Sequence, residues 1–156
     1  MKALFLFIFS VSLHAYAQDS APLNKISVGV ISPLSFTFSN AMELLNPKII
    51  SNALQLSVNV EQQNLNVYAQ TSFSENELNS MKLLSLKLAG KTSPDAGINT
   101  ETVAISDIPA LLFTQPRCLE GSKQYLFYYD LIMNPVQNMI PPGNYQFSIN
   151  FTITAQ

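Results

Sequence analysis

The chain closes with PPGNYQFSINFTITAQ (residues 141–156), and the pattern of this stretch decides the fold class. Every second residue from position 145 to 153 is large and apolar: Tyr145, Phe147, Ile149, Phe151 and Ile153. Uncharged polar residues fill the positions between them. A period of two places the apolar side chains on one face of a β-strand, whereas a helix would scatter them. We therefore predict a half-buried strand of an antiparallel sheet, with these five residues in the core.

A turn signal comes directly before this strand. Pro142 and Gly143 suit the second and third positions of a type II turn, in which proline presets φ and glycine takes a positive φ. This turn is expected to fix where the strand begins.

Similar alternation recurs along the chain. Besides the last strand, we predict strands over residues 26–30, 34–38, 53–60, 65–70, 81–89, 102–105, 111–113 and 122–132. For 81–89 a helix stays open as an alternative, because Leu83 adjoins Leu84. The polar segment 61–64 has the length of a hairpin loop, so 54–60 and 65–70 are predicted to pair as an antiparallel hairpin. Residues 42–52 are predicted to be a connection, although residues 42–45 could begin a helical turn that Asn46-Pro47 stops. Residues 72–80 are predicted to be a loop.

These segments amount to about eight or nine short strands with turn signals between them. Such a pattern predicts an all-β protein, a single immunoglobulin-like antiparallel β-sandwich. No alternation of helix and strand suggests a parallel sheet. One domain is expected, over residues 18–156, because removing 17 of the 156 residues leaves 139, a usual size for a single domain.

Residues 1–17 have the three parts of a secretory signal peptide. Lys2 supplies a positive start, residues 3–11 form an apolar run, and Ala15-Tyr16-Ala17 fits the small-x-small cleavage pattern. We predict cleavage after Ala17. A membrane anchor is the alternative, but the apolar run is well short of the ~20 residues that span a bilayer. The product is expected to be exported to the periplasm, the cell surface or the extracellular space, without a transmembrane segment after cleavage.

The composition narrows the range of partners. Only 12% of the residues are charged, against about 25% in an average protein, and Arg117 is the single arginine. A nucleic-acid partner would need a basic patch, so none is expected. Cys118 is the only cysteine, which excludes an internal disulfide. A small buried thiol is favoured over a bond to another chain.

The residues suited to catalysis are sparse. The only histidine, His14, lies in the segment predicted to be removed, which leaves the product without an imidazole for nucleophilic, metal or acid–base chemistry. For Asp130, in an aromatic strand, a strand-end charge facing water is favoured over a buried carboxylate with a raised pKa. A carboxylate pair stays formally open, but solvated loop positions are expected for Asp19, Glu43, Glu61, Glu75, Glu77, Asp95, Glu101, Asp107 and Glu120. We predict no enzymatic activity, no metal and no cofactor.

Five tyrosines offer an alternative role, as a platform on which sugar rings stack. The sandwich core and its rim are the simpler place for them, and the chain has no tryptophan to extend such a platform. The five are Tyr68, Tyr125, Tyr128, Tyr129 and Tyr145.

Two bacterial families resemble parts of the chain. PGNY (142–145) and the alternating strand that ends in TITA (152–155) are similar to the terminal strand of WxL-type cell-surface domains, and they resemble the last strand of several fimbrial subunits. Residues 54–70, with NLNVYAQ (64–70) in the second arm, look like the equivalent region. The chain lacks the Trp-x-Leu signature. The fimbrial resemblance implies assembly by donor-strand exchange, with Ile26, Val28 and Val30 as the candidate assembly strand.

Taken together, these inferences predict a non-enzymatic, exported structural or adhesive protein of the bacterial surface or envelope, with a fimbrial-type subunit as one form of it. The alternative is a carbohydrate- or cell-wall-binding β-sandwich module. The expected partners are other surface proteins or copies of the chain itself, and for the alternative a cell-wall or host glycan.

Overall fold

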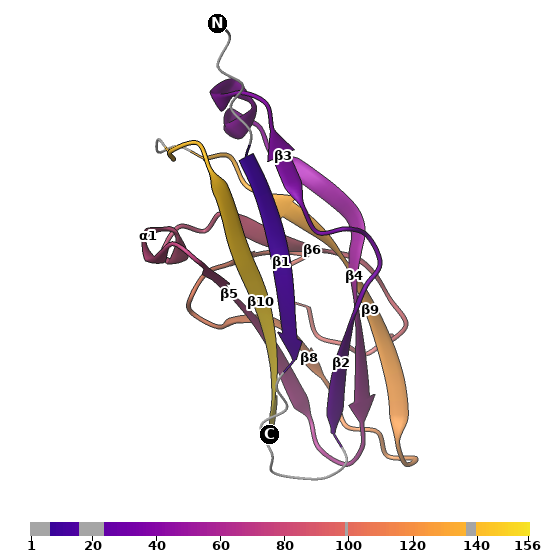
Figure 1. The fold of residues 1–156 in the computed structure, drawn as a ribbon. Helices are drawn as coiled ribbons and strands as arrows, with labels where there is room; N and C mark the ends of the chain where they lie inside the picture. Colours follow the sequence, from indigo (N-terminus) through magenta and orange to yellow (C-terminus); the bar gives the residue numbers. More distant parts are fainter. Residues whose placement is uncertain (1–6, 16–23, 99, 137–139) are drawn as a thin grey trace, which may run out of the picture.

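Two five-stranded sheets pack face to face in the computed structural model, which describes residues 7–15, 24–98, 100–136 and 140–156 (Figure 1). The first sheet has the order β3-β1-β10-β5-β8. Its strands are β1 (Phe7–Ala15), β3 (Phe36–Phe38), β5 (Leu65–Phe73), β8 (Ala110–Gln115) and β10 (Asn144–Ala155). The second sheet has the order β2-β4-β9-β6-β7. Its strands are β2 (Lys25–Val30), β4 (Lys48–Val60), β6 (Leu84–Lys91), β7 (Thr102–Ile105) and β9 (Lys123–Met133).

This architecture confirms the predicted all-β sandwich. Among the described residues, nine strands, β2 to β10, follow residue 17, and β1 lies within the predicted leader. Every strand pair in the described ranges is antiparallel except β1 with β10, which run parallel.

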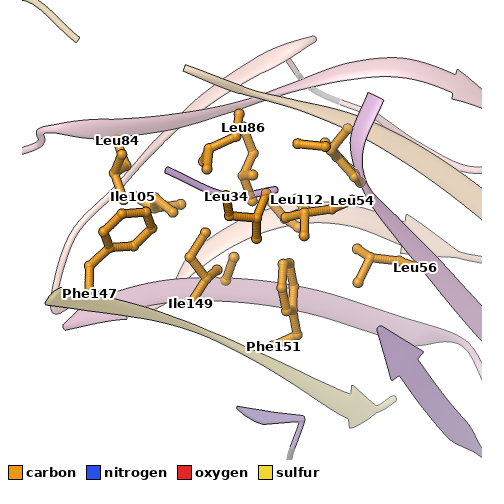
Figure 2. Packing of buried hydrophobic residues seen from close by; sticks show 14 of the residues in the cluster. Leu34, Leu54, Leu56, Leu84, Leu86, Ile105, Leu112, Phe147, Ile149 and Phe151 are labelled. Atoms are coloured by element: carbon orange, nitrogen blue, oxygen red, sulfur yellow. The ribbon is translucent and has the colours of Figure 1, made fainter. Parts of the chain in front are cut away.

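The last strand forms the centre of the core. Phe147, Ile149 and Phe151 are at most 2% exposed, and Tyr145 and Ile153 at the two ends are also buried. In Figure 2 the side chains of Phe147, Ile149 and Phe151 lie opposite four leucines of the second sheet: Leu54, Leu56, Leu84 and Leu86. Burying this apolar face of β10 removes it from water, which is the main force that holds the two sheets together.

A pair of stacked rings also joins the two sheets. Phe113 lies on β8 in the first sheet and Phe127 on β9 in the second, and their ring centroids are 3.8 Å apart with an interplanar angle of 21°. Both side chains are almost completely buried. The contact therefore crosses the full thickness of the core.

The predicted hairpin of residues 54–60 and 65–70 is wrong. β4 belongs to the second sheet and β5 to the first, so residues 61–64 carry the chain from one sheet to the other. The edges of β4 are occupied by β2 and β9, and those of β5 by β10 and β8. The two strands bury their apolar faces in the shared core instead of pairing edge to edge.

The predicted type II turn is also wrong, because Gly143 does not have the positive φ that the turn requires. Gly121 is the only glycine with a positive φ in the described ranges. The start of β10 is held differently: the Tyr145 hydroxyl donates a hydrogen bond to the carbonyl oxygen of Pro141. A Cβ added at Gly143 would lie 3.7 Å from the Tyr145 ring, an ordinary contact.

Two short helical segments lie in the regions predicted as a connection and a loop. Residues 42–52 contain most of the 3-10 helix η1 (Ala41–Leu45), as the alternative of a helical turn had it, and the start of β4. The loop 72–80 contains α1 (Asn76–Asn79). The side chain of Asn40 caps η1, accepting a hydrogen bond from the backbone N–H of Glu43 at 3.1 Å. Within the described ranges, no helix has the length and apolar character needed to cross a membrane.

Candidate functional site

The strand β1 comes from the predicted leader and is an interior strand of the first sheet. It runs parallel to β10, with Cα partners from Ile8↔Asn144 to Ala15↔Phe151, and antiparallel to β3, from Phe7↔Phe38 to Phe9↔Phe36. Figure 1 shows β1 inserted between these two strands. We call the place between β3 and β10 that β1 fills the β1 slot.

The register of β1 follows the buried side of β10. The Cα partners of Tyr145, Phe147, Ile149 and Phe151 are Phe9, Val11, Leu13 and Ala15. In the sequence, these four alternate with Ser10, Ser12 and His14. A signal peptide needs an apolar run but no period of two, so this alternation is the signal by which the strand could have been found.

The other wall of the slot is held by a lysine. Lys48 Nζ lies 2.9 Å from Glu43 Oε2, donates a hydrogen bond to the carbonyl oxygen of Thr37 in β3, and sits 4.4 Å from the centre of the Phe38 ring. The hydrogen bond from Lys48, with one from the backbone N–H of Ser39, lowers the pKa of the Glu43 carboxyl. Lys48 thus connects β3 to η1 and to the start of β4.

The predicted cleavage site, after Ala17, lies outside the described residues. A cut there falls between the end of β1 at Ala15 and the start of β2 at Lys25. β1 would then have no covalent connection to the sandwich. If β1 leaves, β3 and β10 each lose a ladder partner, and two sheet edges are open to pairing with another strand.

The strand with the predicted assembly residues pairs within its own chain. Ile26, Val28 and Val30 lie on β2, which is antiparallel to β4 from Lys25↔Asn59 to Val30↔Leu54. Ile26 is buried, whereas Val30 is 51% exposed. β2 is the edge strand of the second sheet, with β4 as its only ladder partner among the described strands. Pairing with a neighbouring chain stays a prediction.

Two of the carboxylates lie at one small pocket of about 150 Å³. The residues that line it are Glu75, Glu77, Leu78, Met81, Ile140, Pro141 and Tyr145. Sites for small organic ligands are typically about 300–1,000 Å³, so this pocket is small for one. Glu75 and Glu77 are both exposed to solvent. Burial, and then the charge of Glu75, raise the pKa of the Tyr145 hydroxyl, which keeps it neutral.

The acidic and sulfur-containing side chains are otherwise dispersed. In the parts of the chain that the structure describes, no three His, Cys, Asp or Glu residues are placed to hold one metal ion. Cys118 is a buried free thiol, in agreement with the favoured interpretation of the sequence. Its backbone N–H donates to the carbonyl oxygen of Glu61 at 2.6 Å.

The prediction that Asp130 is a strand-end charge is wrong. Asp130 lies in the interior of β9 and is half-buried. Its Oδ1 accepts a hydrogen bond from the backbone N–H of Asn52 at 2.8 Å. Asn52 has a φ of 48° and lies in an irregularity of β4 between Ile50 and Leu54. The carboxylate therefore satisfies a backbone donor that the bulge has removed from the ladder.

We expect Asp130→Ala to lower the free energy of unfolding by roughly 1–2 kcal/mol, because it leaves the Asn52 N–H without its charged acceptor. Asp130→Asn keeps an acceptor oxygen and should lose less than half as much. Urea titration followed by circular dichroism measures both variants. Equal stability of Asp130→Ala and the parent chain would contradict a structural role for this carboxylate.

The tyrosines are not gathered on one surface. Tyr68 lies on β5 in the first sheet, whereas Tyr125, Tyr128 and Tyr129 lie on β9 in the second. Tyr129 and Tyr145 are buried, and burial raises the pKa of Tyr129. The structure therefore places no platform of these five rings on a single face.

No protein-family model matches the chain, and no curated protein matches it. Of the predicted resemblance, the structure confirms only the architecture: this is a mostly β protein with two packed sheets. Its relation to WxL-type domains and to fimbrial subunits stays a prediction.

Proposed function

We propose that this chain is an exported, non-enzymatic structural or adhesive subunit of an assembly at the bacterial surface or envelope. A strand from another polypeptide completes its sandwich after the leader has been removed, as in fimbrial-type subunits. One observation carries the proposal: β1, which fills the slot between β3 and β10, belongs to the segment predicted to be cleaved.

The physical reason is the state of the two strand edges after cleavage. Backbone N–H and C=O groups of β3 and β10 that face β1 lose their partners when it leaves, and unpaired groups of this kind are costly when they are shielded from water. An incoming strand restores the ladder, and its apolar residues extend the inner face of the first sheet beside those of β10. Strand addition of this type gives affinity through the main chain and specificity through alternate side chains.

The composition of the outer face of β10 agrees with a structural role. The polar positions that alternate with its core residues are uncharged: Gln146, Ser148, Asn150, Thr152 and Thr154. The Ser148 hydroxyl lies 2.6 Å from that of Ser72 on β5. This hydrogen bond joins the side chains of the two neighbouring strands.

The test follows the fate of the leader and the size of the product. The full chain is produced in a bacterium, and the exported protein is recovered for N-terminal sequencing and light scattering. We expect the exported protein to begin at Gln18 and to occur in assemblies larger than one chain. Ala17→Arg, which disrupts the small-x-small pattern, is the control and should keep the leader and stay monomeric.

Two results would contradict the proposal. A product that keeps Met1 and stays inside the cell contradicts export. A product that begins at Gln18 but remains a stable monomer at every concentration, alone and in envelope extracts, contradicts the subunit role.

A further inference from the structure

We infer that the β1 slot is a binding site for one extended peptide segment of defined direction and pattern, and that residues 7–15 of the precursor occupy it as a place-holder until the leader is cut. This inference rests on the proposed function in one respect only, which is the strand that replaces residues 7–15 after cleavage. The site itself is defined by the two strands on either side of it.

The direction of the bound segment is fixed by two ladders at once. It runs parallel to β10 and antiparallel to β3. A segment in the opposite direction would need a different hydrogen-bond pattern on both sides, because parallel and antiparallel ladders place their donors and acceptors differently. The slot therefore selects one direction.

The pattern of the bound segment is fixed by the buried side of β10. Four alternate residues of β10 are at most 7% exposed, and their Cα partners on β1 are Phe9, Val11, Leu13 and Ala15. A shift of the segment by one residue would exchange these four with the residues between them. Any occupant needs apolar residues at the same alternate positions.

Covalent connection favours the place-holder before cleavage. Residues 16–24 tether β1 to β2, and a short tether gives an effective concentration on the order of millimolar. A separate strand at micromolar concentration then competes poorly for the slot. Cutting the tether removes this advantage, so cleavage is the step that opens the slot to a partner.

The first experiment tests the register in the full chain. In a Cys118→Ser background, Ser12→Cys is combined with Ser148→Cys, because Ser12 and Ser148 are Cα partners. The control combines Ser12→Cys with Gln146→Cys, which lies two residues away on the same strand. We expect the matched pair to form a disulfide at least about tenfold faster than the control, because disulfides tolerate only a narrow range of Cα separations.

The second experiment tests occupancy after the cut. A specific protease site is placed within residues 18–23 of the full chain, so that the sandwich folds with its leader and is then cut. We expect the leader fragment to dissociate on gel filtration and the Tm to fall. Adding a synthetic peptide of residues 7–15, FIFSVSLHA, should restore a Tm rise on the order of 8 °C at about 100 times its Kd.

A control peptide has the same composition but a broken pattern, with Phe9 exchanged for Ser10 and Leu13 for His14. It should not raise the Tm. Equal effects of the two peptides, or equal disulfide rates for the two cysteine pairs, would overturn the inference.

The outcomes separate this inference from the proposed function. If the cut protein assembles, but the peptide of residues 7–15 neither raises its Tm nor slows assembly, the inference fails and the subunit role stands. If the peptide binds in the stated register and the cut protein never assembles, the inference stands and the subunit role fails.

Discussion

Replacing Phe151 with aspartate is expected to leave the chain without a cooperative unfolding transition. The Phe151 side chain is 0% exposed on the inner face of β10. The substitution removes an aromatic ring, at about 3–5 kcal/mol, and places an unpaired carboxylate in the core, at several kcal/mol more. Their sum is comparable to the whole stability of a typical domain, about 5–15 kcal/mol.

Thr152→Asp is the matched control, because it introduces the same carboxylate one residue further along the same strand. Thr152 is only half-buried, and we expect this variant to unfold cooperatively within about 1 kcal/mol of the parent chain. Differential scanning calorimetry compares the two. Similar transitions for both variants would contradict the assignment of one buried and one outer face to β10.

Phe127→Ala is expected to lower the free energy of unfolding by about 3–5 kcal/mol. Phe127 is 0% exposed and stacks on Phe113 of the opposite sheet, so its removal leaves a cavity between the sheets and ends an aromatic contact. Phe127→Leu keeps part of the volume and should lose substantially less. Urea denaturation followed by fluorescence measures each value.

The control for this series is Leu119→Ala, since Leu119 is 82% exposed. It should change the stability by no more than about 0.5 kcal/mol. A loss below about 1 kcal/mol for Phe127→Ala would mean that the two sheets do not depend on this stacked pair.

The fold class was predictable because a sheet with one buried face requires apolar and polar residues to alternate along each strand. The alternation from Tyr145 to Ile153 is the clearest case, and the structure buries all five of its apolar residues. Local pattern carries no information on which strand lies beside which. The connection 61–64 has the length of a hairpin loop and also suffices to cross between sheets, so the partners of β4 and β5 were not determined by it.

The candidate site was hidden for two physical reasons. Its strand, β1, lies in a segment whose apolar run also fits a signal peptide, and one sequence can satisfy both patterns. Its partner β10 lies at the far end of the chain, so no local sequence pattern indicates that the two strands pair. The link between Asp130 and Asn52 was missed for the same reason, because it joins strands that are distant in sequence.

The ladder between β1 and β10 joins the first strand of the chain to the last. At about 5–20 residues per second, a ribosome needs roughly 8–30 s to make the 156 residues. The middle of the first sheet cannot close during that time. Contacts of such long sequence separation also form slowly after synthesis. The order of the strands thus delays closure of the first sheet until synthesis is complete, which suits the proposed export, because a precursor threads through a secretion channel in an unfolded state.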